Sequence, residues 1–588
     1  MDNDAPSQDA SLHAQTGEIP GRVTIFDASL CDIEGEVDAL SDATTCCFRF
    51  VDCEAFLGES VLRIFEYESL PAQKYSAVSH VWKGLPMLEG STAKTFNITG
   101  TKKDASPISV DVLRTACYAS LAFQSQLLWL DLLCIMQGNR EDKSWQIQRM
   151  FTIFQNCHVC LILPGGLTRL ATLHDETTWI HRAWTLQESV APDMSFCLFS
   201  WNLGPATSFR FSLGTIIELV RGETAMAHLI DLLNLSLIST GAELDLHEFP
   251  RDLSMIRDER FTSAPYMGME MSKNPTRVYV DIRIFGHNRS LDEKMHYPLL
   301  VQALTANGDR RENALWRSSF LRTSSRSVDA VISIMGLFGV TLDPDSYREG
   351  DRLRATIDLM REILRMGGRA NWLTFSGRSR IAYEFCLAPR FPEVDEAGEA
   401  FYRRPADGRE VTAATYFGLN WWWLRKLPRG SMDDEGHLTF RAPALPLPET
   451  ASAPSLGGLG GWGGSYAEPR QEEYRELDEI CERKTRAHSC LTRGEEGARS
   501  YAVWIGTKKP FAPSGMSLVS PRFLVVMLVH RHAAGEPFFN VGIEPVGEDF
   551  ARHPDLMARE FTVGGFDPAA GNEGEGRGGG GRGLHFRA

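Results

Sequence analysis

Residues 23–205 predict an α/β domain with a mostly parallel sheet and helices on both of its faces. Two observations support this prediction: short apolar runs of strand length recur through the region, and segments with helical periodicity lie between them. Strands that alternate with helices are joined by crossover connections, which favour parallel pairing and place helices over the sheet. A chain of 588 residues has room for about three or four domains.

The strands and helices of this domain can be placed from local patterns. A first helix is expected from Ser106 and Pro107, which suit the N-cap and the first helical position. A second is expected after Asn139, because Glu141 and Asp142 in its first turn favour the positive end of a helix. The expected strands are residues 61–67, 76–81, 127–134, 158–163 and 195–199.

The rest of the chain divides by composition. An amphipathic face formed by Leu353, Ile357, Met360 and Leu364 indicates a helix in the middle of the chain. Three apolar runs after residue 497 indicate strands. The predicted parts are a disordered N-terminus (1–22), the α/β domain (23–205), a mainly helical region (206–450), a Gly/Ser-rich linker (451–470), a small α+β unit rich in strands (471–563) and a disordered Gly-rich tail (564–588).

Composition narrows the class of function. The formal net charge is −15, which disfavours non-specific binding to nucleic acid. The longest apolar run, Phe523–Val529, falls far short of the ~20 residues that a membrane helix needs, so no membrane association is expected. The polar N-terminus and the scattered cysteines predict a cytoplasmic protein. Cys157 and Cys160 lack a second pair at zinc-site spacing, so no metal site is predicted.

Three segments place polar groups beside expected strand ends. In the first, residues 75–84, an apolar strand runs into Ser79, His80 and Trp82. Polar residues at the carboxyl end of a strand line the ligand crevice of open α/β sheets. The alternative is a strand end with a packed tryptophan.

The second segment contains Asp131 inside an apolar run. A lone carboxylate there is costly unless it is hydrogen-bonded or paired with a charge. Asp131 is therefore either a functional group or a brace that accepts hydrogen bonds from a neighbouring loop.

The third segment is residues 179–191. If it is one helix, His181, Trp184 and Glu188 lie on one face, as a small-molecule site would require. The alternative is an ion pair of Glu188 with Arg182 or His181 that fixes the helix to the sheet. The sequence contains no standard enzyme signature such as a phosphate loop or a G-x-S-x-G motif.

Together, in this order and spacing, the three segments resemble the three blocks of the fungal heterokaryon-incompatibility (HET) domain. His80, Lys83 and Met136 depart from the family pattern. The matching residues are Tyr75, Ala77, Ser79, Trp82 and Gly84 in the first block, Trp129, Asp131, Cys134, Ile135, Gln137, Gln146, Ile147 and Met150 in the second, and Trp179, Arg182, Trp184, Gln187 and Glu188 in the third. Residues 315–340 also resemble the helical region that often follows the domain in mushroom-type members.

The resemblance implies a fungal cytosolic protein that triggers programmed cell death after non-self recognition. Its implied partners are proteins of that pathway, with self-association as a further expectation. HET domains are also thought to be remote relatives of Toll/interleukin-receptor (TIR) domains, which implies a TIR-like or flavodoxin-like fold. Some TIR domains cleave NAD with a glutamate in a W-C-x-x-E-type segment, and residues 184–188 (WTLQE) resemble that segment.

On this resemblance the three blocks should meet around one cleft. Glu188 and Asp131 are the catalytic candidates. No cofactor is implied, and NAD would be a substrate. The alternative function is a non-catalytic interaction module that signals by assembly. The substrate-binding candidates are Ser79, Trp82, Gln137, Arg182 and Trp184.

Overall fold

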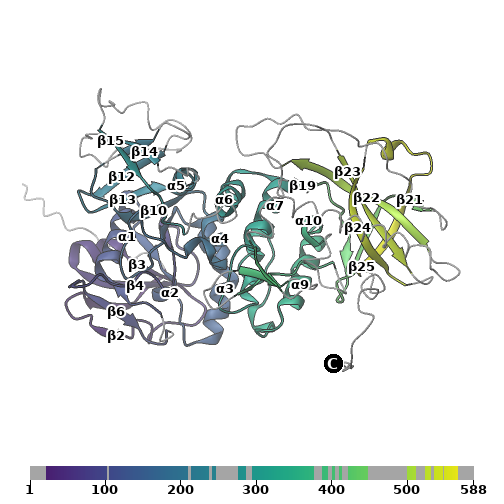
Figure 1. Cartoon of the computed structure of the whole chain (residues 1–588). Helices are drawn as coiled ribbons and strands as arrows, with labels where there is room; N and C mark the ends of the chain where they lie inside the picture. The colour runs from purple at the N-terminus through teal and green to yellow at the C-terminus, as the bar shows by residue number, and fades with distance from the viewer. Residues whose placement is uncertain are drawn as a thin grey trace, which may run out of the picture. The chain divides into compact units, whose positions relative to one another are not determined.

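The structure is a computed structural model in which the chain forms two compact units, one of the described residues up to Leu170 and one from Ala171 onward (Figure 1). The structure describes residues 21–101, 105–204, 206–208, 214–236, 242–246, 276–286, 295–376, 387–394, 400–403, 409–413, 422–447, 499–510, 523–531, 536–546 and 548–566. The predicted disordered ends and the predicted linker lie almost wholly outside these residues.

The main sheet of the first unit is mixed, so the prediction of a mostly parallel sheet is wrong there. Only β8, β5 and β9 pair in parallel, and the other pairings are antiparallel. The reason is that β3 and β4 are joined by a short connection rather than a crossover helix. The six strands, in spatial order, are β1 (Arg22–Ser29), β4 (Val61–Tyr67), β3 (Phe48–Asp52), β8 (Leu127–Trp129), β5 (Tyr75–His80) and β9 (Val159–Leu163).

Helices cover both faces of this sheet, as predicted. The hydroxyl of Tyr75 donates to the carbonyl of Ile153 in α3 (Arg140–Asn156), at 2.7 Å. The next residue of the strand, Ser76, accepts a hydrogen bond from Ser120 of α1 (Val110–Ala122), at 2.8 Å. Successive side chains of a strand point to opposite faces, so α1 and α3 lie on opposite sides.

Local sequence patterns predict the start of α3 correctly but not the start of α1. Asn139 caps α3 as predicted, accepting from the backbone N–H of Asp142 at 3.1 Å. The start of α1 was predicted wrongly: its N-cap is Ser109, because the residues before it form β7 (Ile108–Ser109). The other short elements of this unit are β2 (Gly35–Val37), η1 (Ala55–Glu59), β6 (Thr95–Ile98) and α2 (Asp131–Cys134).

The second unit begins with an antiparallel sheet, so the described part of residues 206–450 contains strands as well as helices. Its strands, in spatial order, are β10 (Ser195–Ser200), β13 (Thr224–His228), β12 (Gly214–Val220), β11 (Ala206–Ser208), β14 (Ala242–Leu246) and β15 (Thr276–Val280). A further three-stranded sheet consists of β16 (Glu393–Val394), β17 (Ala400–Arg403) and β18 (Glu410–Thr412).

Helices of the second unit pack around an aromatic core that includes Trp316, Phe320 and Trp372. The predicted amphipathic helix is present as α9 (Arg352–Arg365), and Ile357, Met360 and Leu364 are buried. The remaining helices are η2 (Trp179–His181), α4 (Ala183–Val190), α5 (Leu229–Ser236), α6 (His296–Thr305), α7 (Gly308–Ser319), α8 (Asp329–Ile332), η5 (Met335–Phe338), η6 (Pro344–Ser346), α10 (Leu373–Ser376) and η7 (Glu548–Arg552).

The C-terminal strands close into a small barrel, which confirms the prediction of a strand-rich unit. The ring closes because β21 (Leu438–Leu447) pairs with both β22 (Arg499–Pro510) and β25 (Met557–Phe566). β21 precedes the predicted linker and β22 follows it, so the linker does not separate two domains. The other strands are β23 (Phe523–Arg531) and β24 (Phe538–Val546), with β19 (Trp422–Arg425) and β20 (Ser431–Met432) at the ends of the sheet.

No helix in the described part of the chain is long and apolar enough to cross a membrane.

Candidate functional site

Asp131 joins the first two blocks in one cluster. It follows β8 in α2, and β8 pairs in parallel with β5, which ends at His80. The carboxyl ends of parallel neighbours meet at one edge of the sheet. There, Asp131 Oδ1 lies 2.7 Å from His80 Nε2, and Asp131 Oδ2 accepts from Trp82 Nε1 at 2.6 Å. The predicted position of Asp131, at the carboxyl end of a central strand, is confirmed.

Both ring nitrogens of His80 face oxygen atoms that can only accept. Its Nδ1 lies 3.1 Å from the carbonyl oxygen of Val81, and its Nε2 lies 2.7 Å from a carboxylate oxygen of Asp131. The side chain of His80 is only 3% exposed, so its contact with Asp131 is nearly buried.

Asp131 is held in its ionised form. Burial would raise the pKa of this carboxyl, but the charge of His80 and hydrogen bonds from His80, Trp82 and the backbone N–H of Leu132 outweigh burial and lower the pKa. Both carboxylate oxygens are thus occupied by donors. This is the bracing arrangement that the sequence left open for Asp131.

The other candidates of these two blocks have different surroundings. The side-chain amide of Gln137 donates to the backbone carbonyl of Asp131 at 3.2 Å and so supports the same turn. Ser79 is fully buried within β5. Trp82 is half-buried, and the ammonium of Lys143 lies 5.8 Å from the centre of its ring. Of these residues, Trp82 combines an accessible surface with direct contact to Asp131.

A buried charge network, which sequence reasoning missed, binds backbone groups of the second block. Arg49 of β3 is fully buried and pairs with Glu66 and Asp142, each at 3.0 Å. Its Nη1 also donates to the carbonyl of Cys134 at 2.9 Å, and Asp142 accepts from the backbone N–H of Met136 at 3.0 Å. A signal was available, because Arg49 interrupts an apolar strand in the same way as Asp131 does.

Gly84, the last residue of the first block, is required by a close backbone approach. A Cβ at Gly84 would lie 2.2 Å from the carbonyl oxygen of Gly165, and a Cβ at Gly166 would lie 2.8 Å from Gly84 Cα. The backbone N–H of Leu85 donates to that same carbonyl at 2.8 Å. The glycine of the first block is therefore a packing requirement of the loop that carries Trp82.

Cys134 has no character of a reactive thiol. It is fully buried, and burial raises the pKa of its thiol to about 12. Its sulfur accepts a hydrogen bond from the backbone N–H of Leu130 at 3.4 Å. Its place in the second block is explained by packing.

The third block is not one helix, so the predicted shared face of His181, Trp184 and Glu188 is wrong. The 3-10 helix η2 ends at His181, Arg182 is extended (φ −82°, ψ 139°), and α4 begins at Ala183. The break exists because Arg182 forms a parallel β-bridge with Thr323. Trp184 and Glu188 remain on one face of α4, one turn apart, and both are half-buried.

The surroundings of the third block are basic. Burial lowers the pKa of Arg322 to about 9, and the charge of Glu188 acts against this decrease. The ring of His181 stands edge-on to that of His296, with centroids 4.6 Å apart. Arg182 and Glu188 belong to the second unit, whereas the Asp131 cluster belongs to the first. The prediction that all three blocks meet around one cleft stays a prediction.

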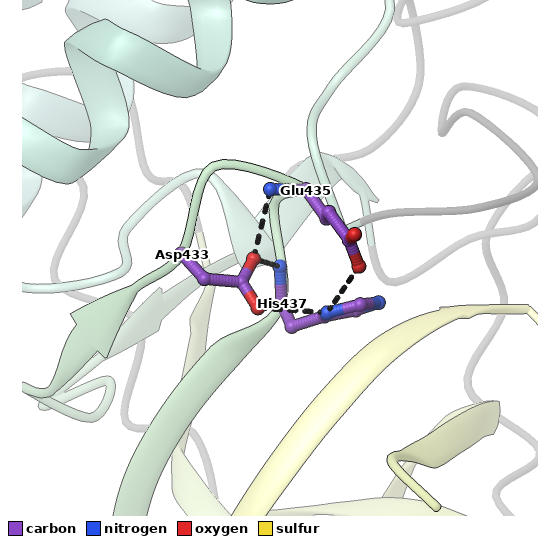
Figure 2. A group of neighbouring side chains, drawn as sticks. All are labelled: Asp433, Glu435 and His437. Atoms are coloured by element: carbon purple, nitrogen blue, oxygen red, sulfur yellow. Dashed lines mark hydrogen bonds and ion pairs between the residues drawn. The ribbon is translucent and has the colours of Figure 1, made fainter.

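One other group of side chains has the spacing of metal ligands. Asp433, Glu435 and His437 lie between β20 and β21, with ligand atoms within 4.8 Å of one another (Figure 2). Asp433 accepts from the backbone N–H groups of Glu435 (3.0 Å) and His437 (2.8 Å), and its other oxygen lies 2.8 Å from His437 Nδ1. These bonds outweigh burial and lower the pKa of Asp433. The geometry is that of a hairpin turn closed by one aspartate.

Comparison with known proteins agrees with the resemblance of the first two blocks, whereas the third block lies outside the match. The family model described as "Heterokaryon incompatibility protein (HET)" matches residues 75–174, which span the first two blocks and the strand β9. No curated protein and no solved structure matches the chain. The match begins at the first residue of β5 and contains the whole cluster of His80, Trp82 and Asp131. Residues 75–174 therefore match the heterokaryon incompatibility (HET) domain, which supports the resemblance to HET domain proteins.

Proposed function

We propose that this protein is an effector of heterokaryon incompatibility, a fungal cytoplasmic protein that brings about cell death after non-self recognition. The observation that carries the proposal is the HET match over residues 75–174, inside which the first two blocks converge on Asp131. Blocks that are distant in sequence and meet around one charged group are typical of a working site. The expected partners are proteins of that recognition pathway, or further copies of the chain.

We further propose that the effector acts by cleaving NAD, with Glu188 as the catalytic carboxylate. Breaking the bond between nicotinamide and ribose builds positive charge on the ribose, and a fixed carboxylate can stabilise that charge or orient the ribose hydroxyls. Glu188 is half-buried on α4, one turn from Trp184, so part of its side chain is exposed. The resemblance of residues 184–188 to the TIR glutamate segment supports the same assignment.

Asp131 has a different role in this proposal. Both of its oxygens already accept hydrogen bonds, so it is poorly suited to attack or to proton transfer. We assign it to hold Trp82 and His80 in place. Trp82, Trp184, Arg182 and Gln137 remain the candidates for contact with substrate, with Trp82 the most accessible of the first block.

The test is expression of wild-type protein and Glu188→Gln in a fungal host, with viability and NAD content followed together. The substitution keeps the shape of the side chain and removes its charge. We expect the variant to remain folded, while killing and NAD loss both fall. Glu223→Gln is the matched control, because Glu223 is exposed in the turn before β13.

The outcomes separate the two functions. If soluble Glu188→Gln kills as well as wild type does, the enzymatic role of Glu188 is rejected and signalling by assembly becomes the better function. If wild type kills without lowering NAD, cleavage of NAD is rejected whatever the variant does. A parallel fall in killing and in melting temperature would assign Glu188 a structural role.

A further inference from the structure

The third block is held in place by a segment that follows the HET domain in the sequence. The backbone N–H of Ala183, the first residue of α4, donates to the carbonyl of Thr323 at 2.8 Å. The N–H of Thr323 in turn donates to the carbonyl of His181 at 2.6 Å. These two bonds flank Arg182, so the break between η2 and α4 depends on Thr323.

The residue before Thr323 extends this contact with its side chain. Arg322 is 1% exposed, and its Nη1 donates to the carbonyl of Arg182 at 3.0 Å and to Thr185 Oγ1 at 2.7 Å. Its Nε donates to Ser318 Oγ at 3.3 Å, at the end of α7. One guanidinium therefore ties the first turn of α4 to α7.

The charge of Arg322 needs an acidic partner. Its Nη2 is buried without a hydrogen-bond partner among the described residues, and an unsatisfied buried cation is costly. The carboxylate whose charge acts on Arg322 is Glu188, and it favours the charged form of the guanidinium. His296 does not add a charge of its own at neutral pH, because burial, with help from the charges of His181 and Arg322, lowers its pKa well below the usual value.

We propose that Arg322 is a positioning residue for Glu188: its hydrogen bonds fix the start of α4, the helix that carries the Glu188 carboxylate. The segment from α6 to α10 then completes the third block instead of merely following the domain. The inference concerns the same site as the proposed function and rests on it for the role of Glu188 in catalysis. The hydrogen bonds of Arg322 to the start of α4 do not depend on that role.

The first experiment is a double-mutant cycle on the full-length protein. Melting temperatures are measured for wild type, Thr185→Val, Arg322→Met and the double variant. Either single substitution removes the 2.7 Å hydrogen bond between Arg322 and Thr185, so we expect the double variant to melt at a higher temperature than the sum of the two single shifts predicts. Arg365→Met is the matched control, because the side chain of Arg365 is 70% exposed and pairs only along its own helix with Glu362.

The second experiment measures local order by hydrogen exchange. In Arg322→Met we expect amides of residues 183–190 to exchange about tenfold faster or more, while those of β22 in the barrel keep their protection. Arg322→Lys keeps the charge, so we expect its amides to be better protected than those of Arg322→Met. Compared at an equal folded fraction, it should also regain part of the killing and of the NAD loss. Should Arg322→Met fail to fold, Arg322→Lys carries the test.

Two results would overturn the inference: additive melting shifts in the cycle, or unchanged exchange at residues 183–190 in a folded Arg322 variant. If wild type shows no NAD loss but the cycle is non-additive, the proposed chemistry fails and the positioning role stands. If NAD loss depends on Glu188 but not on Arg322, the chemistry stands and the positioning role fails.

Discussion

Asp131 and Arg49 illustrate two ways in which the first unit accommodates a charge next to its core. Arg49 is fully buried, and two carboxylates and two backbone carbonyls surround its guanidinium. Asp131 is 15% exposed and receives donors from a histidine, an indole and a backbone N–H. Removing one partner of a network like that of Arg49 costs about 3–5 kcal/mol, which is enough to unfold many proteins. Asp131 is therefore the better residue for a substitution whose effect on the free energy of unfolding can be measured while the protein still folds.

We predict that Asp131→Asn lowers the free energy of unfolding by about 1–3 kcal/mol at pH 7. The amide cannot accept at both positions, so one donor of His80 or Trp82 loses its partner. The pKa of Asp131 is lower in the folded protein than in the unfolded chain. Its stabilising effect is therefore full above about pH 4 and is lost as the pH falls through the folded pKa.

The measurement is urea unfolding, followed by tryptophan fluorescence, across a series from pH 7 to pH 2. The difference in the free energy of unfolding between wild type and Asp131→Asn should become smaller as the pH falls. Asp38→Asn, at an exposed position, serves as the control and should follow wild type throughout. A gap that widens toward acid would mean that Asp131 is not held ionised in the folded protein.

At the scale of elements, the loop after β5 depends on its contact with the turn after β9. Gly84 and Gly166 approach so closely that a single methyl group must displace backbone atoms. Backbone cannot move aside as the end of a flexible side chain can. The contact fixes the path of the segment that leads from His80 through Trp82.

We predict that Gly84→Ala destabilises the protein by about 3 kcal/mol, the upper end of the cost of overpacking. Gly58→Ala is the matched control, because a Cβ at Gly58 meets nothing within 4 Å and its φ is not positive. Thermal unfolding of both variants, with near-ultraviolet circular dichroism of the tryptophans, measures the difference. Equal melting temperatures for the two variants would contradict the close approach.

The elements also show where sequence reasoning succeeds and where it fails. The start of α3 was predictable because Asn139 and Asp142 interact within one turn. The cluster of His80 and Asp131 was predictable in outline because parallel strands end at a common edge. The break at Arg182 was not, since it is set by Thr323, which is distant in sequence and carries no local signal.

At the scale of the whole molecule, the barrel makes the residues before and after the predicted linker parts of one structure. Leu445 and Ala444 of β21 pair with Ala502 and Val503 of β22. Sequence composition could not reveal this, because a Gly/Ser-rich stretch looks alike whether it joins two domains or two strands. Most strands in the described part of residues 206–450 were missed because they are short.

We predict that cutting the chain within the linker leaves its two pieces associated. A protease recognition sequence is inserted between Gly460 and Gly461, and after cleavage the pieces should elute together in size-exclusion chromatography. Backbone hydrogen bonds from β21 to β22 and β25, together with buried side chains along β21, hold the two pieces together. Denaturant should separate them.

The control carries Val503→Asp together with the same insertion. Val503 is fully buried opposite Ala444, so a carboxylate there weakens the closure of the ring. Its cleaved pieces should separate more readily than those of the parent. Separation of the parent's pieces in native buffer would refute the closed ring.

The order of strands around the ring also affects how the protein is made. β21 leaves the ribosome before β22 and β25, and its main partner, β25, comes last, several seconds later at about 5–20 residues per second. During that interval β21 lacks these two partners and presents an open strand edge, which invites pairing with other nascent chains. Pro443 and Pro446 remove two backbone donors from it, and the finished barrel tolerates them because β25 pairs with the first part of β21 and β22 with the last. We infer that the two prolines protect the unfinished chain from aggregation on the ribosome.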